Sequence, residues 1–225
     1  MKVDTRKLPT TSRMLAYAAA TGLAYAVLSQ VVASLTALGD STSATFWPGA
    51  GLTLGVLLAR PRREWPLHLG AVFMAETLMD VKLGYGLDLA LQWAAVNTLE
   101  PFIGAAALTW GGRLAPDISQ RHDLLRFIGL GVVAGPAVGA VAGAVGGFLL
   151  VGDPWWPRLP QWFIGDAVGA LVVAPAVMLA ASGALRRPPR RVVGAGAALL
   201  AGALWRSVRG ISAATWGCPS SWCRP

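Results

Sequence analysis

Long apolar runs alternate with short polar connections along most of this chain. The runs lie at residues 14–38, 46–59, 65–80, 87–110, 124–151 and 161–182. Four of them exceed the roughly 20 residues that an α-helix needs to cross the hydrocarbon core of a bilayer. The pattern predicts an all-α, polytopic transmembrane helix bundle of six spans. A seventh apolar run, 192–205, has only 14 residues, so its length leaves open whether it crosses.

Composition supports a membrane protein. Hydrophobic residues make up 55% of the chain and charged residues 13%, against about 25% charged residues in a typical soluble domain. The formal net charge is +8, but the basic residues fall in short runs between the apolar segments. Such runs orient membrane helices. We therefore expect the protein to interact with the lipid bilayer and not with nucleic acid.

Lysine and arginine are distributed unevenly among the connections. They gather in the N-terminal segment and in the connections 60–63, 113–126 and 186–191. At most one occurs in each of the connections 39–45, 82–86 and 152–160. Because basic connections stay on the cytoplasmic side, we expect a cytoplasmic N-terminus and six spans that return the chain to the cytoplasm.

Three regions follow from this reading. Residues 1–13 form a basic cytoplasmic N-terminus, residues 14–205 an integral membrane domain, and residues 206–225 a tail of atypical composition. The abrupt loss of apolar character after Trp205 suggests a truncated or altered reading frame, which would make the membrane domain incomplete. Cys218 and Cys223 lie in this tail, so no disulfide or cysteine-based metal site is expected to hold the membrane domain together.

Acidic side chains interrupt the predicted spans. Glu100 and Asp166 have no basic residue within a helical turn, and Glu76 falls near the middle of the third span. A carboxylate at the centre of a membrane helix costs roughly 2.5–3.5 kcal/mol on insertion scales, so each of these groups needs a partner, a proton or water. Asp80 and Lys82 fall near the outer end of the third span, where we expect the interface to satisfy both.

The fourth predicted span carries the densest set of polar groups. Asn97 and Glu100 are three residues apart and share one face of a helix. Pro101 lacks the N–H that would bond the carbonyl of Asn97, which leaves a free acceptor near the Glu100 side chain. We predict that Glu76, Asn97, Glu100, Pro101 and Asp166 form a ligand- or signal-sensing site for a cation, a proton or a polar molecule. The alternative is that these groups only hydrogen-bond neighbouring helices.

A glycine stripe marks the fifth predicted span. Glycines recur every four residues and so line one side of a helix, at Gly131, Gly135, Gly139, Gly143 and Gly147. Small residues at this spacing let helix backbones approach closely. The stripe predicts either tight packing inside one bundle or a sliding or dimerising face, which would allow a homodimer. Pro136 beside it removes a helical donor and predicts a kink.

Catalytic signatures are missing from the sequence. It contains no G-x-S-x-G or H-E-x-x-H motif, and no serine with a credible neighbouring base. We expect a protein that is not an enzyme, with no catalytic residue, cofactor or metal.

Four segments resemble the membrane-associated sensor family, first class (MASE1). They are FWPGAGLTLGVLL at 46–58, WPLHLGAVFMAE at 65–76, NTLEPFIGAAAL at 97–108 and WFIGDAVGALVVAPAVM at 162–178. The resemblance covers residues 14–182. Its family-like positions are Trp47, Pro48, Gly51, Asn97, Glu100, Pro101, Gly165, Asp166, Gly169 and Pro175.

The resemblance implies a sensory input module in the bacterial plasma membrane. Members of that family precede cytoplasmic output modules such as histidine kinases and diguanylate cyclases, and usually have about eight or more spans, whereas this chain ends at residue 225. The expected partner is therefore a separate histidine kinase or diguanylate cyclase module, or another membrane protein. The alternative function is a small-solute or cation transporter, or the substrate-binding subunit of one. The sequence names no stimulus.

Overall fold

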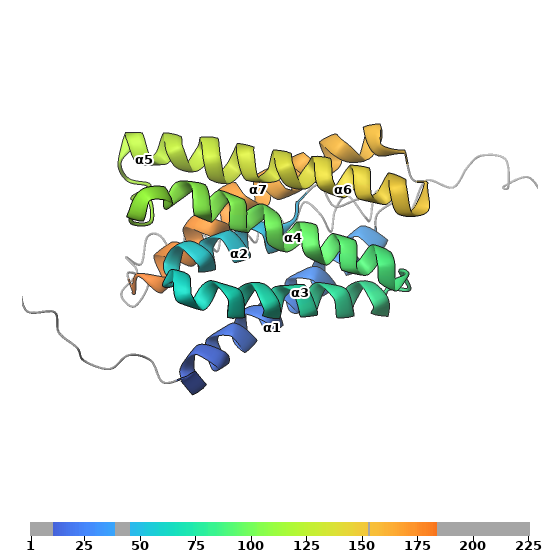
Figure 1. Cartoon of the computed structure of the whole chain (residues 1–225), viewed down its shortest axis with the longest axis horizontal. Coiled ribbons are helices and arrows are strands. Elements are labelled where there is room, and N and C mark those ends of the chain that lie inside the picture. Colours follow the sequence, from blue (N-terminus) through green and yellow to red (C-terminus); the bar gives the residue numbers. More distant parts are fainter. Residues whose placement is uncertain (1–10, 39–45, 153, 184–225) are drawn as a thin grey trace, which may run out of the picture. The chain divides into compact units, whose positions relative to one another are not determined.

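The computed structural model describes residues 11–38, 46–152 and 154–183. These residues form helices only (Figure 1). The main helices are α1 (Thr11–Leu38), α2 (Pro48–Ala59), α3 (Trp65–Lys82), α4 (Leu87–Leu108), α6 (Gly135–Val151) and α7 (Trp155–Ala181). The short elements are η1 (Arg62–Glu64), η2 (Trp110–Gly112), α5 (Arg121–Arg126) and the π-helix η3 (Phe127–Ala134). The predicted all-α class is confirmed for the described part of the chain.

Three helical segments are long and apolar enough to cross a membrane. They are Thr11–Leu35, Arg121–Val151 and Trp155–Ala181. The α2 helix is apolar but has only 12 residues, and α3 and α4 do not meet the same standard of length and composition. Six helical segments form where the sequence predicts six spans, but six spans are not confirmed, because only three of the segments qualify on their own length and composition.

The sixth predicted span begins earlier than expected. The sequence pattern placed its start at residue 161, whereas α7 begins at Trp155. Pro157 lies in the first turn of α7. Backbone N–H groups in a first turn have no partner inside the helix, so the missing N–H of proline costs no hydrogen bond there. Asp166 therefore lies eleven residues into its helix, about 16 Å along the axis rather than the 8 Å expected. The run 192–205, the tail 206–225, Cys218 and Cys223 lie outside the described residues.

Pro136 follows directly after a π-helix. The N–H of Gly135 bonds the carbonyl of Leu130, five residues earlier, and η3 joins α5 to α6 without a break in the helix. Widened turns of this kind rearrange the hydrogen bonds around a residue that has no donor. The proline that predicted a kink thus stands at the junction of two helix types.

The surface is apolar and the interior contains polar groups. Along α1, Leu23, Val27, Val31 and Leu35 recur every four residues, and each is about half exposed or more. Polar and charged side chains are buried instead, including carboxyls on α3, α4 and α7. A soluble domain has the reverse arrangement. A helix bundle in a bilayer is more stable when apolar side chains face the lipid. The described structure is that of a membrane-embedded protein.

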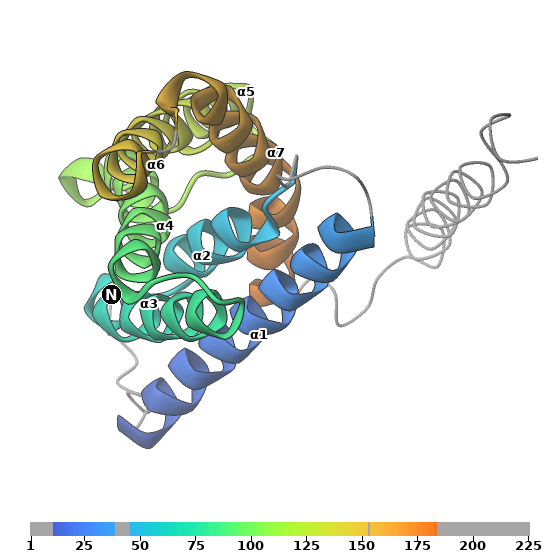
Figure 2. The ribbon, with the colours of Figure 1, turned by 90° about the vertical axis from the view of Figure 1, so that its right-hand side faces the viewer.

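The short helix α2 lies inside the bundle. It contacts α1, α3, α4 and, most extensively, α7, and Figure 2 shows it enclosed by these helices. Glycines allow the close approach to α7: a Cβ at Gly51 would collide with the carbonyl of Gly169, and a Cβ at Gly169 with that of Trp47. The N–H of Trp47 donates to the carbonyl of Gly165 at 2.9 Å. These contacts fix the start of α2 against the middle of α7.

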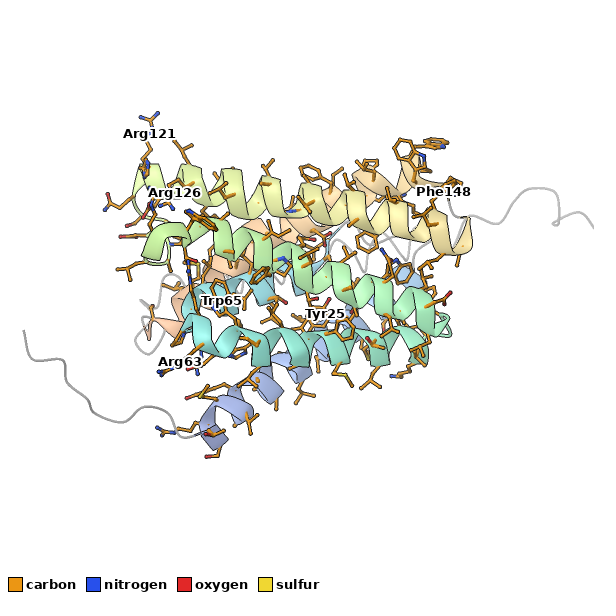
Figure 3. All side chains as sticks on the ribbon, in the orientation of Figure 1. Tyr25, Arg63, Trp65, Arg121, Arg126 and Phe148 are labelled. Atoms are coloured by element: carbon orange, nitrogen blue, oxygen red, sulfur yellow. The ribbon has the colours of Figure 1, made fainter. Side chains whose placement is uncertain are left out.

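The hydrophobic core occupies the half of the bundle that contains α2. Its buried members come from α2, α3, α4, η3 and α7: Leu54, Leu57, Leu58, Trp65, Ala105, Leu108, Phe127, Val132, Ala170 and Ala174. The same half ends in basic side chains, and Figure 3 shows Arg63, Arg121 and Arg126 together at one end. There Arg126 donates to the carbonyl of Leu108 at 2.7 Å, and Arg62 to the hydroxyl of Thr109 at 2.8 Å. Cations at the carbonyl end of α4 stabilise it.

The contact between α2 and α7 can be tested by adding one methyl group. We expect Gly51→Ala to lower the thermal unfolding midpoint in detergent, because overpacking against a backbone carbonyl typically costs about 1–3 kcal/mol. Gly70→Ala on α3 is the matched control, since its Cβ would meet nothing within 4 Å. Equal unfolding temperatures for the two variants would show that α2 and α7 do not cross at these glycines.

Candidate functional site

A cavity of about 420 Å³ lies in the other half of the bundle. Its walls come from the end of α1, the end of α3, the start of α4, the end of α6 and the start of α7, and Trp47 precedes α2 at its edge. Leu83, Tyr85 and Val151 line it and are themselves exposed, so the cavity opens at the end opposite the core.

Three buried carboxyls line this cavity. Glu76 and Asp80 are one turn apart on α3, and Asp166 reaches it from α7. Asn97 on α4 also lines it, and its amide donates a hydrogen bond to Oε1 of Glu76. Three of the five site residues predicted from the sequence, Glu76, Asn97 and Asp166, thus meet around one space.

Glu100 lies behind the cavity. It is buried and does not line the cavity. Its carboxyl lies within hydrogen-bonding reach of the Asp166 carboxyl. On its other side the Glu100 carboxyl fills the space that a side chain at Gly139 would need. Pro101 is buried within α4 next to it and also lies outside the lining. The structure joins Glu100 to the site through Asp166.

The acids of this cluster lack basic partners. No salt bridge joins any of these four carboxyls to a basic side chain in the described part of the chain. Oδ2 of Asp80, Oδ2 of Asp166 and Oε2 of Glu100 are buried without a hydrogen-bond donor. Two carboxyls in contact inside a bundle require a shared proton, a cation or water. The cluster therefore has unsatisfied capacity to accept hydrogen bonds and positive charge.

The residues described include no group of three or more histidine, cysteine, aspartate or glutamate side chains placed to hold a metal ion. Glu76, Asp80 and Asp166 instead share the wall of a cavity of about 420 Å³. A cavity of this volume suits a molecule larger than a single ion.

Aromatic rings form a second part of the cavity wall. Trp93 on α4 and Trp162 on α7 both line it, with ring centroids 6.1 Å apart. Tyr85 extends the row, edge to face with Trp93 at 4.8 Å. Trp47 completes the lining near Asp166 and packs against the buried Tyr25 at 6.2 Å. A ligand in the cavity would meet carboxyls and aromatic faces together.

The glycine stripe of η3 and α6 faces the interior. Gly131 lies against Leu108, Gly135 against the Glu100 carbonyl, Gly139 against the Glu100 carboxyl and Gly143 against the Trp162 ring. The fifth member, Gly147, has open space beside it and lines the cavity. Four of the glycines thus make room for α4 and α7 within one bundle, and a homodimer remains an untested prediction.

Asp80 is the carboxyl that the sequence interpretation misassigned. We expected it to be satisfied at the interface near Lys82, but it is 7% exposed and lines the cavity, while Lys82 donates to Gln30 at 2.8 Å. Its spacing of four residues from Glu76 was the available signal, because residues i and i+4 share a helix face. The aromatic wall had no such signal, since its rings come from three separate segments.

The contact between Gly139 and Glu100 can be tested with a double-mutant cycle. We expect Gly139→Ala to lower the unfolding midpoint, because the added methyl group would collide with the Glu100 carboxyl. Adding Glu100→Ala removes the colliding group, so the double variant should be more stable than the two separate effects predict. Gly129→Ala, whose methyl group would meet nothing within 4 Å, is the control. Strictly additive effects would mean that the two residues do not touch.

Comparison with known proteins gives one family. The MASE1 family model matches residues 17–222, a range that includes all helices of the described structure except the first turns of α1 and continues into the tail. No curated protein and no solved structure matches the chain.

Proposed function

The chain belongs to the MASE1 family, whose members are membrane sensory input modules, and we propose that it detects its stimulus in the acid-lined cavity and signals to a cytoplasmic partner. The observation that carries this proposal is the set of buried carboxyl oxygens without donors, on Asp80 and Asp166, at the wall of a cavity that opens to one end of the bundle. Unpaired acids inside membrane domains mark functional sites by default.

Signalling would proceed through helix α7. It carries Asp166 at the cavity, is held to α2 by the glycine contacts, and ends at Ala181 in the half of the bundle that contains the core. A stimulus that prefers one packing of α7 against α2 would shift the population of that packing. Because these backbones touch directly, a shift at the cavity would move the far end of α7 as well.

The proposed orientation has the N-terminus in the cytoplasm, with six segments crossing the inner membrane of a bacterium. Arg63, Arg121 and Arg126 at one end of the bundle support it (Figure 3), because basic residues stay on the cytoplasmic side. In this orientation the cavity opens outward, away from the output partner. That partner would be a histidine kinase or diguanylate cyclase module, or another membrane protein.

One observation favours transport as a second candidate. The 12-residue α2 begins inside the bundle, with its N-terminus beside Asp166, and half-length helices that end near a binding site occur in transporters. Transporters of that type usually contain a related pair of such helices, whereas the described residues contain one.

The sensory role is tested by joining a diguanylate cyclase domain to the C-terminus and measuring cyclic di-GMP. We expect Asp166→Asn and Glu100→Gln to change the output several-fold at unchanged membrane abundance, because both remove charge from the buried cluster while keeping side-chain size. Asp88→Asn is the control, since Asp88 is exposed at the start of α4 and does not line the cavity. Loss of output only in proportion to abundance would mean that these acids serve folding alone.

A further inference from the structure

We propose that the cavity binds a small primary organic amine, with its ammonium group against the carboxyls and its carbon skeleton against the aromatic wall. This inference rests on the proposed function, because it names the chemical class of the stimulus at the same site.

The carboxyls supply the ammonium subsite. Asp166 is 3% exposed and Asp80 is 7% exposed, and the Oδ2 atom of each accepts no hydrogen bond. Oε1 of Glu76 is held by the amide of Asn97, which orients this third carboxyl at the cavity wall. A primary ammonium group carries three N–H donors and a positive charge, so it supplies what these unpaired carboxyl oxygens lack.

Charge selects a cation over an anion. The lining contains three carboxyls, and Arg158 is the only basic residue of that lining among the described residues. Arg158 lies two turns before Asp166 on α7, about 12 Å along the helix axis. An anionic ligand would therefore meet three carboxyls in the wall of the cavity, whereas a cation would be attracted by them.

The aromatic rings supply the other subsite. Trp93, Trp162 and Tyr85 form a continuous row along one wall, and indole faces attract organic cations and pack against apolar groups. A bare metal ion would leave this row without a ligand contact, and no metal-binding group of three side chains is found in the described residues. The volume of about 420 Å³ is in the range of small-molecule pockets.

Binding can be measured by titrating the full-length protein, in nanodiscs of zwitterionic lipid, with methylammonium, butylammonium and benzylammonium chloride. Calorimetry and tryptophan fluorescence give two readouts, with empty nanodiscs as the blank. We expect saturable binding of butylammonium or benzylammonium, and none of benzyl alcohol or benzoate, which carry the same phenyl ring without the positive charge. Binding of benzyl alcohol as tight as that of benzylammonium, or no saturable binding of any of the three amines, would overturn the proposal.

Matched variants assign the binding to the cavity. Asp80→Asn and Asp166→Asn should each weaken amine affinity about tenfold or more, because they remove a charged acceptor, and Trp93→Leu should weaken benzylammonium more than methylammonium. Asp88→Asn and Trp156→Leu change exposed residues at the same end, outside the lining, and should keep the unmodified affinity. Circular dichroism and the unfolding midpoint identify any variant that fails to fold. Equal weakening by the control variants would contradict the assignment.

Amine binding and cyclic di-GMP output together show which of the two proposals fails, the ligand class or the sensory role. If no amine binds but Asp166→Asn still changes cyclic di-GMP output at constant abundance, the ligand class is wrong and the sensory role stands. If benzylammonium binds but neither the amine nor Asp166→Asn changes the output, the site stands and the sensory role is wrong.

Discussion

The length of α2 is the constraint on which the rest of the structure depends. Twelve residues rise only about 18 Å, against roughly 30 Å for the hydrocarbon core of a bilayer. Because glycine contacts fix the start of α2 against the middle of α7, the helix fills one half of the bundle, and none of the helices described occupies the centre of the other half. The hydrophobic core forms in the first half and the cavity in the second. Asp80 and Asp166 line that cavity beyond the start of α2.

The polar cluster is arranged in layers of decreasing access to the cavity. Asp80 and Asp166 have oxygens without donors, Glu76 is bound by Asn97, and Glu100 lies behind Asp166 against Gly139. Groups that served only to join helices would be expected to satisfy one another, since an unpaired polar atom in a buried site costs about 1–3 kcal/mol. The unsatisfied oxygens of Asp80 and Asp166 belong to residues that line the same cavity as the aromatic row, which is why we interpret the cluster as a binding site.

Much of the architecture could be predicted from local sequence. Each of the six apolar runs before residue 183 became helical, and the Trp-Pro pairs at Trp47 and Trp65 mark helix starts because proline is accepted in a first turn. The burial of Glu76, Asn97, Glu100 and Asp166 followed from their isolation in apolar segments. The start of α7 was predicted six residues too late, because the prolines at 157 and 160 were read as a connection. A cavity shared by the acids could be suggested from the sequence, but its walls could not, since they depend on which helices touch. Asp80 was misassigned because its distance from Lys82 is set by the helix face and not by sequence proximity.

The central claim is that an outward-facing, hydrated cavity with a negative wall lies beside α6, and chemical accessibility tests it most directly. In a background with Cys218→Ser and Cys223→Ser, Ala144→Cys at the cavity wall would be treated in intact cells with cationic and anionic methanethiosulfonates of similar size. Val141→Cys, on the exposed apolar face of the same helix, is the control. We predict that Ala144→Cys reacts from outside, several-fold faster with the cationic reagent, while Val141→Cys does not react. Absence of reaction at Ala144→Cys, or equal rates for the two reagents, would contradict this account.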